Sequence, residues 1–413
     1  MTLGISQVEG FSIGSLTETA DGLSSGSEAL ESNATTVINS LDRVSTDWSG
    51  EAKTQAAVKA KDHADQINDR SKRWTDAAVV LRNAADQLGK LKDEIIATAN
   101  DMIVRYVCDV ADNGVATVKG SYLAMLADVY KDDPKGLATA RHSAFSLAQK
   151  TSYKLVTLLN SMDVAAQYYD WTVESALLGY GIHPTGARPF VPRIPPPPAA
   201  PSGPIDDANR DGSGPAQYDT YKPNLLNQTY LQGLRAAAQS GALATSPALP
   251  IAGRLMRHFF GNSGKPYNFD VDTMRGDMPG FAGTADNDAR RRANDALSVM
   301  PEGYHGPVAF QGAWNEGDKG FRPDATSHPD YWASLGTFAY QTSGVYMPED
   351  GGNGTGPANI TYQTSIYDYY NWDTTKKNYS EQYSDLNDLH RAGWAQNYQV
   401  YGTSGPSSVT VPQ

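Results

Sequence analysis

Two segments of the sequence repeat apolar residues every seven positions, and this repeat restricts the fold more than any other feature. Alanine and serine alternate with the larger residues, so two helices carrying these repeats can approach each other closely. A seven-residue apolar repeat places its residues along one side of a helix that packs beside another helix. The sequence therefore predicts two long helices that face each other. The larger residues of the two seams include Leu16, Leu23 and Leu30, then Ile67, Trp74 and Leu81.

The first repeat ends at residues 47–50, which read Asp-Trp-Ser-Gly. Glycine adopts the left-handed backbone conformation that a tight reversal of the chain needs. Two long amphipathic helices joined by a short turn fold back on each other as an antiparallel hairpin. We therefore expect a helical hairpin that reverses at Trp48 and Gly50.

A hairpin of this kind with a Trp-x-Gly turn resembles the Trp-x-Gly (WxG) family, the helical-hairpin substrates of actinobacterial type VII (ESX) secretion systems. The resemblance covers about residues 10–110. It implies that Trp48 and Gly50 form the turn recognised in export and that the seam binds a partner. The partners it implies are the secretion machinery or its chaperone, and a small WxG protein. It also implies a cytoplasmic protein that is exported to the cell envelope or beyond without a signal peptide.

Composition and charge narrow the possible functions of the chain. Its 34 Lys and Arg against 46 Asp and Glu give a net charge of −12, which repels phosphate backbones, so we expect no nucleic-acid partner. No run of 18 apolar residues is present, so we expect no membrane-spanning helix. The first ten residues have neither a positive run nor an apolar stretch, so we expect no conventional signal peptide. The single cysteine, Cys108, is interpreted as a buried small hydrophobe on a helix.

A proline-rich segment divides the chain. Nine prolines fall between Pro184 and Pro204, and such a run favours a stiff polyproline II spacer over a helix or sheet. We interpret it as a tether, with a docking motif for a proline-reading partner as the alternative. The predicted domains are a helical export and interaction domain (1–182), a linker (183–204) and an aromatic-rich domain (205–413).

The second half mixes two patterns. Residues 304–405 contain runs of aromatic and β-branched residues between glycine-rich breaks, which predict strands. The spacing in 225–260 and 284–300 predicts helices, and a further helix is predicted near 384–398. The predicted fold class is an N-terminal all-α bundle built on a long hairpin, a proline-rich linker and an α+β domain with a small antiparallel sheet.

Two clusters of charged residues stand out in this half. Asp368, Asp373 and His390 are candidates for acid–base catalysis; the alternative is that the aspartates end a strand while His390 lies on a helix. The run from Arg290 to Arg292 is interpreted as a solvated helix face rather than a phosphate clamp.

These observations leave three functions open. The first is a secreted type VII-associated protein with a helical export module and a C-terminal binding domain. The second makes the C-terminal domain a toxin-like hydrolase that acts on envelope material. The third is a structural or interaction protein that is not exported. No catalytic motif of known spacing is present, so enzyme activity stays open and binding is favoured.

Asp207, Asn209 and Asp211, followed by glycine, match the first half of a calcium loop. The twelfth position, which should supply a bidentate glutamate, is Tyr218. We therefore expect no cofactor and interpret the segment as a polar turn, with calcium binding as the alternative.

A chelator should leave the melting temperature of the protein unchanged if this segment is only a turn. Bound Ca²⁺ would stabilise the folded chain by mass action. Thermal unfolding with EDTA, and then with excess calcium, checks this. A fall of several degrees that calcium reverses would identify an ion site.

Overall fold

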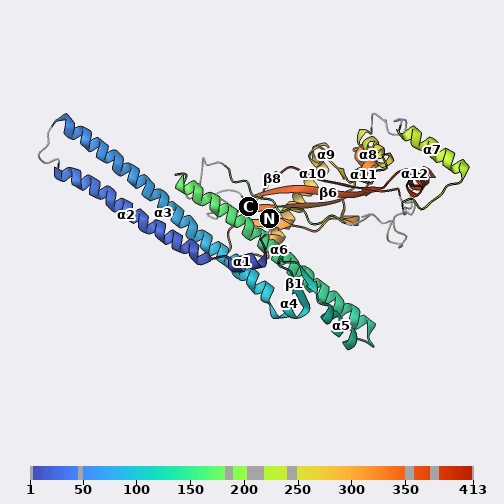
Figure 1. Ribbon diagram of the computed structural model, residues 1–413, viewed down its shortest axis with the longest axis horizontal. Helices are drawn as coiled ribbons and strands as arrows, with labels where there is room; N and C mark the ends of the chain where they lie inside the picture. Colours follow the sequence, from blue (N-terminus) through green and yellow to red (C-terminus); the bar gives the residue numbers. More distant parts are fainter. Residues whose placement is uncertain are drawn as a thin grey trace.

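The computed structural model describes residues 3–44, 50–181, 189–201, 218–239, 249–348, 358–372 and 381–411. A part built on long helices comes first and an α+β part follows, as the sequence predicts (Figure 1). The first part contains α1 (Ile5–Gly10), α2 (Ile13–Val44), α3 (Glu51–Asn100), α4 (Met102–Val107), β1 (Cys108–Val110), β2 (Ala116–Val118), α5 (Gly120–Val129) and α6 (Pro134–Leu177).

Helix α2 pairs with the first half of α3 in an antiparallel two-helix arm, whose far end lies away from the sheet (Figure 1). Most residues buried between the two helices are small, and they include Ala20, Ala34 and Ala64. Gly26 lies directly against the Trp74 ring, because a Cβ at this position would come within 2.5 Å of a ring carbon. The predicted hairpin is confirmed, and small residues bring its helices together.

A polar layer crosses the arm halfway along its length. The hydroxyls of Ser27 and Ser71 lie 2.7 Å apart, and each also lies within hydrogen-bond distance of the backbone carbonyl of the other residue, at 2.9 and 3.1 Å. Thr75 and Glu31 complete the network with contacts of 2.7 and 3.0 Å. Because buried hydroxyls need partners, this layer fixes one register between the helices.

The second half of α3 packs against α6 and forms the core of the helical part. Leu91 and Ile95 of α3 and Leu155 and Leu158 of α6 are fully buried. Complete burial of side chains of this size contributes about 1.5–3 kcal/mol each. Val8 of α1 joins the same cluster and anchors the start of the chain.

The chain after α3 differs from the predicted continuous helix. The Asp101 carboxylate accepts hydrogen bonds from the N–H groups of Ile103 and Val104 and starts the short helix α4. Cys108 then begins β1, which pairs antiparallel with β2. The helical prediction for Cys108 is wrong because Gly114, with φ of 82°, allows a hairpin turn here. Its burial is confirmed, at 2% exposure.

The second part is built on a six-stranded sheet in the order β3-β7-β6-β5-β4, with β8 beside the first half of β6. All pairs are antiparallel except β3 with β7, so the sheet is mixed and larger than predicted. Its strands are β3 (Tyr267–Asn268), β4 (Val308–Gln311), β5 (Ala339–Met347), β6 (Asn359–Tyr370), β7 (Tyr398–Thr403) and β8 (Ser407–Thr410). Its helices are α7 (Leu225–Gln239), α8 (Pro250–Phe260), α9 (Val271–Asp277), α10 (Pro279–Leu297), η3 (Gly317–Lys319), α11 (Pro329–Leu335) and α12 (Glu381–Arg391).

The two faces of the sheet carry different neighbours. Side chains alternate along β5, so Thr342 faces α10 while Ser343 and Val345 face the opposite side. On the α10 side, Ala289 and Ala293 pack against Phe310 and other buried residues of the sheet. On the opposite side lie α6 and the proline-rich segment.

Helix α6 joins the two parts of the molecule. Its Ser161 hydroxyl accepts a hydrogen bond from the Ala309 N–H of β4 at 3.1 Å. Val164 of α6 packs with Ala309 and Val345, and all three are at most 1% exposed. The helical part and the sheet therefore share a buried interface.

Residues 189–201 of the proline-rich segment lie against the sheet. Backbone carbonyls of this segment accept hydrogen bonds from Ser343 at 2.9 Å and from the Trp314 ring N–H at 3.0 Å. Proline cannot donate from its own nitrogen, but its carbonyl remains a full acceptor. This part of the segment is thus bound along its length rather than free in solution.

Gly26→Ala should destabilise the arm, because the new methyl group meets the Trp74 ring. Gly22→Ala is the matched control, since a Cβ there has no neighbour within 4 Å and alanine favours the helix. We expect the free energy of unfolding of Gly26→Ala to lie about 1–3 kcal/mol below that of Gly22→Ala. Chemical denaturation measures both, and equal stabilities would contradict the close packing described.

Candidate functional site

One of the two predicted turn residues lies at the free end of the arm. Gly50 stands immediately before α3 with φ of 87°, a conformation that favours glycine. Trp48 lies outside the described residues. The seam residues are on the facing sides of α2 and α3, where Leu81 is buried and the others are half-buried. These others are Leu16, Leu23, Leu30, Ile67 and Trp74.

The two acid–base candidates that the structure describes fall on different elements. Asp368 lies on β6, 8% exposed, and accepts a hydrogen bond from the Tyr369 N–H. His390 lies in the last turn of α12, 5% exposed, with its Nδ1 3.3 Å from the Ala395 carbonyl oxygen. Asp373 lies outside the described residues. Since both described side chains are buried, neither is open to a ligand at the surface.

The calcium candidates Asp207, Asn209 and Asp211 also lie outside the described residues. Within the described ranges, no group of three or more His, Cys, Asp and Glu side chains is placed to hold a metal ion. The helices of these ranges also lack any stretch with the length and apolar character of a membrane span.

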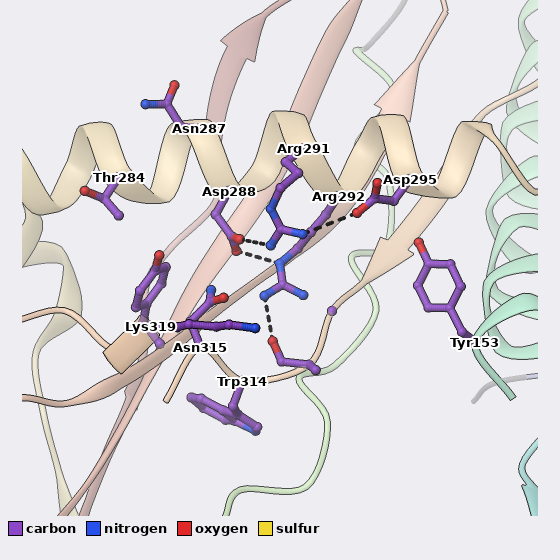
Figure 2. Close-up of a pocket in the computed structure, with 13 residues that line it drawn as sticks. Tyr153, Thr284, Asn287, Asp288, Arg291, Arg292, Asp295, Trp314, Asn315 and Lys319 are labelled. Carbon is purple, nitrogen blue, oxygen red and sulfur yellow. Dashed lines mark hydrogen bonds and ion pairs between the residues drawn. The ribbon is translucent and has the colours of Figure 1, made fainter. Parts of the chain in front are cut away.

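A pocket of about 750 Å³ opens beside the sheet, between α10, the chain that follows β4, and α6 (Figure 2). Tyr340 of β5 is one of the residues that line it. Cations, carboxylates, amides and aromatic rings all contribute to it. The lining residues are Tyr153, Thr284, Asn287, Asp288, Arg291, Arg292, Asp295, Gly312, Ala313, Trp314, Asn315, Lys319 and Tyr340.

A buried ion pair forms the back of this pocket. Asp288 and Arg292 stand one helical turn apart on α10, and their side chains are only 4% and 7% exposed. Arg292 Nε donates to Asp288 Oδ2 at 2.5 Å, while its Nη2 donates to the Ala313 carbonyl at 2.6 Å. Gly312 leaves room for the guanidinium, because a Cβ there would lie 0.9 Å from Arg292 Nη1.

Asp288 accepts hydrogen bonds from three side chains. Besides Arg292, it accepts from the Thr342 hydroxyl at 2.8 Å and from Arg291 Nη2 at 2.5 Å. Burial is the largest single influence on this group and opposes its charge. Arg292 and the hydrogen bonds outweigh burial and hold the pKa of the Asp288 carboxyl below its usual range. The pair thus ties α10 to both β5 and the loop after β4.

The open side of the pocket carries two further cations. Arg291 is 55% exposed and also reaches Asp295, with Nη1 to Oδ2 at 3.3 Å. Lys319 lies on η3 at the facing wall, and no carboxylate of the described residues lies within 4 Å of its amine. Figure 2 shows the Lys319 side chain extending toward the middle of the pocket.

Aromatic and amide groups supply a further part of the lining. Asn315 exchanges backbone hydrogen bonds with Tyr340, and its buried side-chain Nδ2 has no hydrogen-bond partner within the described part of the chain. Burial raises the pKa of the phenols of Tyr153 and Tyr340, so both stay neutral and keep their O–H groups. Trp314 stands in the same loop, with its ring N–H bound to Ala199.

Sequence reasoning found the arginine run but not the pocket. The interpretation of a solvated helix face fails for Arg292, which is buried, and for Asp288 beside it. The four-residue spacing of these two residues was a signal for their pairing. Nothing in the sequence signals the contribution of Ala313, because only the fold brings that loop to α10.

Comparisons of this chain with protein-family models, with curated proteins and with solved structures found no match.

Asp288→Asn should lower the free energy of unfolding by about 3–5 kcal/mol, since it leaves Arg292 buried without its counter-charge. Asp295→Asn, at a half-exposed ion pair, should lower the free energy of unfolding by less than about 1 kcal/mol.

Because folding lowers the pKa of Asp288, the stabilisation that its ionised carboxylate provides is fully present above the ordinary aspartate pKa of about 4. It should be lost as the pH falls through the lowered value. Chemical denaturation of wild type and both variants from pH 7 to pH 3 checks both expectations. If the two substitutions lowered the free energy of unfolding by the same amount, this would contradict the buried pair.

Proposed function

We propose that this chain is a type VII-associated export substrate whose helical arm is the export and partner-binding module and whose α+β part is a binding domain. The observation that carries the proposal is the arm itself. It is a long antiparallel hairpin that projects beyond α6, and its second helix begins directly after Gly50 (Figure 1).

The construction of the arm suits recognition by another protein. Its internal contacts use Ala, Ser and Gly, so the larger seam residues such as Leu30 and Ile67 stay half-buried. A partner that covers these side chains would gain apolar contact that the hairpin does not complete alone. The partners proposed are the secretion machinery or its chaperone, and a small WxG protein. This proposal rests on hairpin geometry, not on a family match.

The pocket favours a binding domain over a hydrolase. General acid–base catalysis needs a carboxyl that is free to exchange a proton with the substrate. Asp288 already accepts hydrogen bonds from two arginines and Thr342, and Asp295 is paired with Arg291. Both carboxylates of the pocket therefore position cations.

Trp48→Ala and Gly50→Ala should reduce the amount of protein in the culture filtrate while the α+β part stays folded. Val58→Ala is the control, because Val58 is 55% exposed on α3, away from the turn. Immunoblots of filtrate and cells, with and without a working type VII core component, measure export. Unchanged secretion of both turn variants would contradict the export module. Retention of wild type in both strains would favour the non-exported interaction protein.

A further inference from the structure

The pocket beside α10 holds more hydrogen-bond donors than its own carboxylates can use. Its lining includes three cations, Arg291, Arg292 and Lys319, against the two carboxylates of Asp288 and Asp295. Each guanidinium has five N–H donors, and the described contacts occupy two of them in Arg291 and two in Arg292. The pocket is thus locally cationic.

The donors are held in place before any ligand arrives. Asp288 and the Ala313 carbonyl fix the guanidinium plane of Arg292 from two directions. Arg291 is held between Asp288 and Asp295. Because these groups already have their orientation, a ligand would not bear the entropy cost of ordering them.

Asn315 provides an independent sign of an incomplete site. Its side-chain Nδ2 is buried and has no hydrogen-bond partner among the described residues. Buried polar atoms in folded proteins are nearly always satisfied, so this donor lacks an acceptor that a bound molecule would bring. It lines the pocket together with Lys319 (Figure 2).

The surroundings limit the size and kind of the ligand. The whole chain carries a net charge of −12, which disfavours a long polyanion but allows one small anion to enter a local cationic site. Tyr153, Trp314 and Tyr340 add aromatic surface to a pocket of about 750 Å³. Such surface suits a ring or other flat apolar group.

We propose that this pocket binds a small organic oxyanion, a carboxylate or phosphate attached to a ring, with Arg291, Arg292 and Lys319 holding the anionic group. The aromatic side chains contact the ring, and Asn315 donates to the ligand. This binding is separate from the arm and from export.

Titration calorimetry on the intact protein tests the proposal with four probes at constant ionic strength. Phenyl phosphate and benzoate carry a ring, whereas inorganic phosphate and acetate do not. We expect at least one ring-bearing probe to bind about tenfold more tightly than its ring-free counterpart. Preference for phenyl phosphate would identify phosphate as the favoured anion, and preference for benzoate would identify carboxylate.

Variants connect the binding to these side chains. Lys319→Gln and Arg291→Gln should each weaken the preferred probe about tenfold, as expected for loss of a charged hydrogen bond. Arg290→Gln and Arg322→Gln are matched controls, because neither side chain lines the pocket, and they should bind as wild type does. Thermal unfolding confirms that each variant is folded. Absence of binding by all four probes would overturn the proposal, as would equal binding by pocket and control variants.

Discussion

Helix α6 packs against α3 through Leu155 and Leu158 and against the sheet through Ser161 and Val164, so one helix takes part in the buried cores of both parts. The rest of the arrangement depends on this double use of α6. It fixes the base of the arm on one side and β4 on the other. The outer part of the arm extends beyond α6 and has no third helix of the described chain beside it, because the base of the arm is held by the common core (Figure 1).

In the α+β part a buried ion pair connects separate elements, whereas in the helical part apolar packing connects them. The pair formed by Asp288 and Arg292 bridges α10, β5 and the loop after β4, while alanines of α10 supply the close apolar contact. A buried pair contributes little net stability, but it is costly to break. It therefore selects one placement of the loop, and that placement forms the pocket wall from which Lys319 extends.

The sequence predicts those features that depend on local periodicity. The heptad repeats predict α2 and α3, and aromatic runs predict β5 and β6. It does not predict contacts between distant segments. The Arg292 bond to Ala313 and the binding of the proline-rich segment by Ser343 both depend on how the sheet folds. The sequence does not predict the β1–β2 hairpin either, because helical spacing continues across Cys108 and the turn depends on the backbone conformation of Gly114.

Hydrogen-exchange mass spectrometry of the intact chain in increasing denaturant tests the shared interface most directly. Peptides from 155–169 of α6 and from 339–347 of β5 report on its two sides. If α6 joins the parts into one cooperative unit, both peptides should lose protection at the same free energy of opening. Loss of protection in α6 while β5 stays fully protected would contradict this account, since the two parts would then unfold independently.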